Sequence, residues 1–125
     1  MPQLQGVSSD AGRTDSLIPE KNDCTVRAYA TVTGMSYRDA WRELAAAGRK
    51  FRKGFHVEPF YRKKFGFPLP RPNCTVHNFV NAFCKHGKWI VLVRGHVFAV
   101  VDGVVHDMRP EMNANKHVLM VWRVH

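Results

Sequence analysis

The pattern of apolar positions changes character late in the chain. Before residue 88, apolar side chains recur at the spacing of one helix face, which predicts helices over residues 24–33, 36–48, 58–65 and 75–86. After it, short β-branched and aromatic runs predict strands over residues 89–93, 96–101, 104–108 and 118–124. Helices followed by an antiparallel sheet indicate an α+β fold.

Several residues mark where the first two helices begin and end. Asn22 and Asp23 are both suited to cap the first helix, and Gly34 is a natural stop at its C-terminus. Ser36 followed by Asp39 resembles a capping box at the start of the second helix. These signals place an apolar helix directly after residue 23.

One folded domain is expected. Residues 1–21 are polar and predict a flexible lead-in, so residues 22–125 form the single domain. Within it, the proline-rich segment 67–72 predicts an extended linker. No stretch approaches the roughly 20 apolar residues that span a bilayer, and the N-terminus lacks the basic start and apolar run of a signal peptide. We therefore expect a cytoplasmic protein with no membrane partner.

Positive charge is concentrated in one stretch of the chain. The formal net charge is +9, and residues 49–65 contribute seven Lys or Arg against one Glu. We call these seven side chains the basic patch: Arg49, Lys50, Arg52, Lys53, Arg62, Lys63 and Lys64. Such a patch attracts nucleic acid, an acidic protein or an anionic surface. The alternative is a solvated face that only keeps the protein soluble.

The dipeptide Asp102-Gly103 is a strong signal for a two-residue hairpin turn between two of the predicted strands. A turn at this place pairs Phe98 with Asp107. Residues directly opposed, or two apart on one strand, project to the same face. His96, Phe98 and Asp107 therefore share a face, and His96 lies diagonal to Asp107, within reach of a hydrogen bond.

The cysteines do not suggest a disulfide framework, because they are three in number and unevenly spaced. Cys24 falls in the first turn of a predicted helix, where unpaired N–H groups and the helix dipole favour an anion and lower the pKa of a thiol. The alternative is that Cys24 is a small core residue. The spacings of Cys74, His77, Cys84 and His86 do not match common zinc patterns, so we predict no metal or other cofactor.

Two short motifs, residues 22–28 and 95–107, carry a resemblance to a known family. A cysteine at the start of a buried helix, then a Gly-His pair at the head of a strand and an Asp on the next strand, resembles the papain-like cysteine peptidase superfamily. The chain is particularly similar to small uncharacterised phage and bacterial proteins of that fold. The resemblance implies Cys24 as nucleophile, His96 as base and Asp107 as the residue that orients the histidine. It also implies a helical half packed against a small antiparallel sheet.

The same resemblance leaves the oxyanion donor open. Many papain-like enzymes place a glutamine several residues before the cysteine, a region occupied here by Ile18, Pro19 and Glu20. Asn22 is the nearest amide, and the backbone N–H of Cys24 is a second candidate. The expected activity is hydrolysis or acyl transfer at an amide or isopeptide bond of a peptide or protein, since the superfamily also includes transglutaminases, deamidases and acyltransferases. The alternative function is non-catalytic binding of nucleic acid or an acidic host protein through the basic patch.

Overall fold

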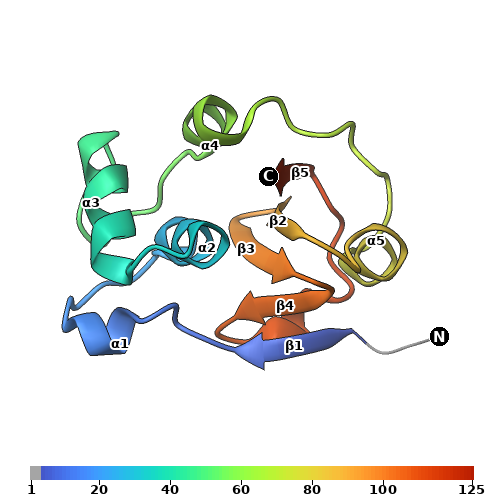
Figure 1. Ribbon diagram of the computed structural model, residues 1–125, viewed down its shortest axis with the longest axis horizontal. Coiled ribbons are helices and arrows are strands. Elements are labelled where there is room, and N and C mark those ends of the chain that lie inside the picture. Colours follow the sequence, from blue (N-terminus) through green and yellow to red (C-terminus); the bar gives the residue numbers. More distant parts are fainter. Residues whose placement is uncertain (1–3) are drawn as a thin grey trace.

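A computed structural model describes residues 4–125 and shows an α+β fold (Figure 1). Within these residues, five α-helices surround a five-stranded mixed sheet. The helices are α1 (Arg13–Ser16), α2 (Cys24–Thr33), α3 (Tyr37–Ala46), α4 (Glu58–Phe65) and α5 (Val76–Phe83). The strands are β1 (Gln5–Ser8), β2 (Lys88–Val93), β3 (His96–Val101), β4 (Val104–Asp107) and β5 (Met120–Val124), with a 3-10 helix, η1 (Pro110–Asn113), before β5. None of the helices in this part of the chain is long and apolar enough to cross a membrane.

The helices begin and end close to the predicted positions because local signals set their ends. The hydroxyl of Ser36 accepts a hydrogen bond from the N–H of Asp39 at 3.1 Å, at the start of α3. Thr75 caps α5 in the same way, accepting from the N–H of Asn78 at 3.4 Å. Gly34 follows α2 with a left-handed φ of 74°, a conformation that favours glycine.

The sheet has the strand order β1-β4-β3-β2-β5. The strands from β2 onward pair antiparallel, as predicted. β1 runs parallel to β4, with Gln5 opposite Val104 and Ser8 opposite Asp107. The predicted C-terminal strands are therefore antiparallel, and the additional strand β1, which the sequence does not predict, makes the sheet mixed.

Residues 4–21 carry regular structure, namely β1 and α1, where the sequence predicts a flexible lead-in. The outer edge of β4 offers unpaired backbone groups, and β1 satisfies them through its own backbone. Its side chains are exposed, so no apolar pattern announces the strand. Gly6 allows β1 to approach η1, since a Cβ at this position would lie 2.5 Å from Cβ of Pro110. Residues 1–3 of the predicted lead-in lie outside the described residues.

The sheet separates two apolar clusters. Successive residues on a strand point to opposite faces, so Ile90 and Ala99 pack with α2, α3 and α4. Val91 and Phe98 pack on the other face with α5. Figure 1 shows α2 and α5 on opposite sides of the strands. The first of these clusters holds α2 in place against the sheet.

The proline-rich segment 67–72 runs from α4 to α5 and contains no helix, as predicted. It makes one bridge to the sheet, in which the N–H of Leu69 donates to the carbonyl of Val121 at 2.8 Å. The segment thereby carries the chain from one face of the sheet to the other past β5.

A buried ion pair ties the N-terminal segment to the residues that follow α3. The two guanidinium NH groups of Arg49 lie 2.9 and 3.0 Å from the two carboxylate oxygens of Glu20, and both residues are buried. The carboxylate also accepts from the indole N–H of Trp41 at 2.7 Å and the backbone N–H of Arg52 at 2.9 Å. Burial alone would raise the pKa of Glu20, but the hydrogen bonds from Arg49 and Trp41 lower it to about 2.

Replacing Glu20 with Gln is expected to lower the free energy of unfolding by about 3–5 kcal/mol at neutral pH, because it leaves Arg49 buried without its counter-charge. Urea unfolding followed by circular dichroism measures this. The pKa of Glu20 is lower in the folded state than its ordinary 4.5, so its stabilisation is present above pH 4.5 and is lost as the pH falls toward 2. The gap between wild type and variant should close over that range. The exposed Glu111→Gln is the control, and equal stability of the two variants would contradict this role.

Candidate active site

The hairpin turn that brings β3 and β4 together forms as predicted. Asp102 and Gly103 have φ values of 48° and 83°, as a turn with two left-handed residues requires. The three pairs next to the turn are in the predicted register. The fourth predicted pair, Phe98 with Asp107, is not part of this ladder. On its other edge, β4 pairs with β1 up to Asp107.

His96 and Asp107 lie at the same end of the sheet, since one begins β3 and the other ends β4. The Nε2 atom of His96 lies 2.6 Å from Oδ2 of Asp107. The ring of Phe98 lies beside that of His96, with centroids 6.1 Å apart and planes 30° from parallel. The contact between His96 and Asp107 that the hairpin predicts is therefore confirmed.

The carboxylate of Asp107 is buried and accepts three further hydrogen bonds. Oδ2 accepts from the side-chain amide of Asn113 at 2.8 Å. Oδ1 accepts from Arg27 at 2.9 Å and from the backbone N–H of Met108 at 2.8 Å. Burial alone would raise the pKa of Asp107, but hydrogen bonds from His96, Asn113 and Arg27 hold it well below its usual range. The group is an anion at all physiological pH values.

Cys24 is the first residue of α2 and is partly buried. Burial alone would raise the pKa of its thiol. The hydrogen bond and positive charge of His96 act in the opposite direction, as do the backbone N–H of Val97 and the charge of Arg27. The net result is a pKa of Cys24 below its ordinary value. The structure therefore brings Cys24, His96 and Asp107 together, in this order.

Asp23 is the residue directly before α2, but its carboxylate makes no capping hydrogen bond to the helix, contrary to the prediction. It is buried and accepts from Arg13 and Arg27 at 3.1 Å each and from the hydroxyl of Tyr37 at 2.8 Å. These three donors satisfy its charge away from the helix. The N–H groups in the first turn of α2 therefore lose the acceptor that a capping side chain would supply, and they can stabilise an anion at Cys24.

Asn22, the expected oxyanion donor, is exposed, and its amide N–H donates to the carbonyl of Arg52 at 3.3 Å. Among the described residues that line the cavity next to Cys24, Asn22 is absent. Its φ of 51° belongs to the turn that leads into α2, which directs its side chain to residue 52. The other candidate oxyanion donor from the sequence, the backbone N–H of Cys24, belongs to the same residue as the thiol.

The imidazole of His96 has a pKa raised to about 9, first by its hydrogen bond to Asp107 and then by that to Cys24, while burial acts against both. Its Nε2 atom is engaged by Asp107, which leaves Nδ1 for the thiol. A raised imidazole pKa and a lowered thiol pKa together favour a thiolate–imidazolium pair at neutral pH.

The other two cysteines have the opposite electrostatics. Burial raises the pKa of Cys84 to about 12 and also raises that of Cys74. All three thiols are free. No group of three His, Cys, Asp or Glu side chains within residues 4–125 is arranged to hold a metal ion. Cys24 is thus distinguished from the other thiols by its surroundings.

A cavity of about 300 Å³ opens beside the thiol, and we call it the thiol cavity. Cys24 and His96 both line it. Its other walls come from residues 54–58, from Leu92 at β2 and from Met120 at β5. The cavity is of the size of a small-molecule or side-chain site.

The basic patch is only partly a surface feature. Three of its members have acidic partners: Arg49 pairs with Glu20, Arg62 with Glu58 and Lys64 with Glu43. Assigning Arg49 to a surface patch is wrong, because its guanidinium is buried against Glu20. The exposed members outside these pairs are Lys50, Arg52, Lys53 and Lys63.

Two residues of the site were not singled out from the sequence. Arg27 joins Asp107 to Asp23 through two ion pairs. The sequence does contain a feature that could have identified it, because Arg27 is the one charged residue in the segment Cys24–Thr33. Asn113 is 1% exposed and holds Asp107 from η1, and nothing in its local sequence announces this contact.

Comparison with protein families, with curated proteins and with solved structures finds no match for this chain.

Replacing Asp107 with Asn is expected to lower the pKa of His96 from about 9 toward 6.5, because it removes the carboxylate that raises it most. Two-dimensional NMR of the ring protons against pH measures this directly. Asp102→Asn, at the exposed hairpin turn, is the control and should leave the pKa of His96 unchanged. A pKa of His96 that stays near 9 in Asp107→Asn would show that the carboxylate does not govern the imidazole.

Proposed function

We propose that this protein is a papain-like cysteine hydrolase or acyl-transfer enzyme. One observation carries the proposal: the buried, fully hydrogen-bonded carboxylate of Asp107 holds His96, which interacts with the thiol of Cys24 at the start of a helix. An anionic carboxylate, an imidazole and a thiol in series form the arrangement that activates a cysteine nucleophile.

The chemistry follows from the proton positions. The Cys24 thiolate attacks the carbonyl carbon of an amide and forms a C–S bond. His96 gives its Nδ1 proton to the amine as the C–N bond breaks, which leaves a thioester. Water, or an acceptor amine, then gives a proton to His96 and attacks the thioester carbon. The C–S bond breaks and the thiolate returns. Asp107 holds the tautomer and orientation of the imidazole throughout.

The helix start supplies the electrostatics for the oxyanion. The tetrahedral intermediate places negative charge next to the first turn of α2, where the backbone N–H of Cys24 is the proposed donor to the oxyanion. Because the carboxylate of Asp23 is held by Arg13, Arg27 and Tyr37, it does not accept from the N–H groups in the first turn of α2. The mechanism uses only groups of the chain itself and no cofactor. The substrate is proposed to be a peptide or protein amide or isopeptide, in a cytoplasmic setting.

The alkylation rate of each cysteine against pH is the first test of the proposal. Cys24 is expected to react with iodoacetamide much faster than Cys74 and Cys84 near pH 6, with an apparent pKa below the free-thiol value of about 8.5. Mass spectrometry after limited alkylation reports the three rates in one sample. His96→Ala should remove the advantage of Cys24, whereas His106→Ala, on the opposite face of the hairpin, should preserve it. A Cys24 that titrates like a free thiol in folded protein would remove the main support for an enzyme.

Activity gives a second test once a substrate is found. Cys24→Ala should abolish turnover while leaving the thermal unfolding transition in place. His96→Ala should lower kcat by about 10²–10⁴, the usual contribution of a general acid–base. Retained turnover in Cys24→Ala would assign the reaction to another group.

The second candidate function, non-catalytic binding of nucleic acid or an acidic protein, is favoured by one observation. Three exposed basic residues lie close together in the sequence, namely Lys50, Arg52 and Lys53. If they form the binding surface, reversing all three charges should abolish association with an oligonucleotide or an acidic peptide, measured by fluorescence anisotropy at two salt concentrations. Cys24→Ala should leave such binding unchanged. Association that survives the charge reversal excludes this surface.

A further inference from the structure

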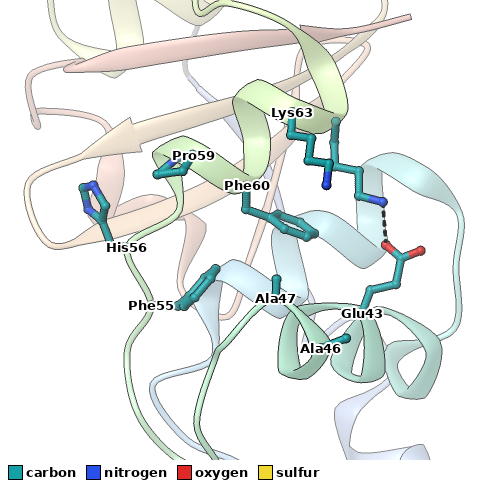
Figure 2. A pocket seen from close by; sticks show the side chains of 9 residues that line it. Glu43, Ala46, Ala47, Phe55, His56, Pro59, Phe60 and Lys63 are labelled. Carbon is teal, nitrogen blue, oxygen red and sulfur yellow. Dashed lines mark ion pairs between the residues drawn. The ribbon is translucent and has the colours of Figure 1, made fainter.

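A larger cavity lies next to the thiol cavity, between α3 and α4 (Figure 2). We call it the α3–α4 pocket, and its volume is about 660 Å³. Figure 2 shows α4 contributing Pro59, Phe60 and Lys63 on one side and α3 contributing Glu43 and Ala46 on the other. It is within the size range of pockets that bind a ligand of several side chains.

The α3–α4 pocket and the thiol cavity share a wall. Phe55 and His56, from the segment before α4, line both of them. A peptide chain bound at Cys24 therefore has to pass only these two residues to place a side chain in the α3–α4 pocket. This proximity makes the pocket a candidate for substrate selection.

The inner surface of the pocket is mainly apolar. The rings of Phe55 and Phe60 meet edge to face, with centroids 6.3 Å apart, and form an aromatic wall. Opposite them, Ala46 and Ala47 have short side chains at the end of α3, which leaves the space open. A pocket with two phenylalanine rings on one side and two alanines on the other suits a large apolar side chain, either aromatic or long aliphatic.

The rim of the pocket carries excess positive charge. Lys64 lies 3.5 Å from Glu43 and its ammonium sits over the ring of Phe60 at 5.7 Å, so these two charges largely offset each other. Lys63 is exposed and belongs to none of the ion pairs found among residues 4–125. The net charge at the rim is therefore positive and complements a carboxylate next to the apolar side chain.

We infer that the α3–α4 pocket selects the substrate of the Cys24 site, and that it takes a large apolar side chain with an acidic neighbour in the peptide. The inference rests on the proposed function, because it assigns the pocket to the reaction at Cys24. Phe55, Phe60 and the two alanines accept the apolar side chain, and Lys63 attracts the acidic one.

Reactive tripeptides test the selection. One set carries a chloromethyl ketone at the C-terminus and a second set carries a chloroacetyl group at the N-terminus, so that both directions along the substrate are covered. Each set has three tripeptides. The first contains phenylalanine and glutamate, the second phenylalanine and glutamine, and the third alanine and glutamate. The rate of Cys24 alkylation, followed by intact-protein mass spectrometry, should be highest for phenylalanine with glutamate in at least one set. Loss of the ring should slow it about tenfold or more, and loss of the acid roughly two- to fivefold.

Paired variants localise the effect to the pocket. Ala46→Leu fills the α3–α4 pocket and should remove the preference for phenylalanine. Ala45→Leu is the matched control, because Ala45 is an exposed neighbour on the same helix that does not line the pocket. Lys63→Glu should remove or invert the preference for glutamate, whereas the exposed Lys50→Glu, outside the pocket, should preserve it.

Iodoacetamide, which is too small to reach the pocket, separates the two proposals. Rapid iodoacetamide reaction of Cys24 without any preference among the tripeptides in either set overturns the inference and leaves the proposed enzyme standing. A preference that persists equally in Ala46→Leu and Ala45→Leu also overturns it. Slow reaction of Cys24 with iodoacetamide removes the proposed function, and the inference falls with it. A preference that is present in wild type and lost only in Ala46→Leu and Lys63→Glu supports both the proposed enzyme and the selecting role of the pocket.

Discussion

The buried carboxylate of Asp107 is the constraint on which the rest of the site depends. It accepts from His96 on β3, Arg27 on α2, Asn113 on η1 and the N–H of Met108. A buried charge that loses its partner costs about 3–5 kcal/mol, so the carboxylate favours the arrangement in which these elements meet at the end of β4. The alignment of imidazole and thiol is therefore a consequence of satisfying one charge.

Arg27 extends this constraint to the start of α2. It bridges Asp107 to Asp23, a second buried carboxylate that also holds Arg13 and Tyr37. Diverting Asp23 from its capping role gives up the ~1 kcal/mol that an N-cap contributes to a helix. In exchange, the carboxylate joins α1, α2 and α3, and the positive end of α2 is left to the thiol of Cys24. Local helix stability is therefore reduced at the end of α2 where the thiolate of Cys24 is proposed to form.

The parts of the fold that the sequence predicts are those set by neighbouring residues. The cap at Ser36 and the turn at residues 102–103 depend on a few adjacent side chains, and the turn also places His96 against Asp107. β1 was missed because its pairing with β4 uses backbone groups and exposed side chains. The buried position of Arg49 was missed because a row of basic residues does not reveal that Glu20, distant in sequence, removes one of them from the surface.

Part of the exposed positive charge that remains after these pairings lies next to the two cavities. Lys53 precedes Gly54, the first of the residues 54–58 that line the thiol cavity, and Lys63 lines the pocket beyond it. A positive field at the mouth of a cleft raises the local concentration of anionic ligands. The positive charge of Arg27 also favours the thiolate form of Cys24 over the thiol. In the proposed enzyme, positive charge therefore acts in two ways: Arg27 favours the thiolate of Cys24, and the exposed Lys53 and Lys63 attract acidic groups toward the cavities beside it.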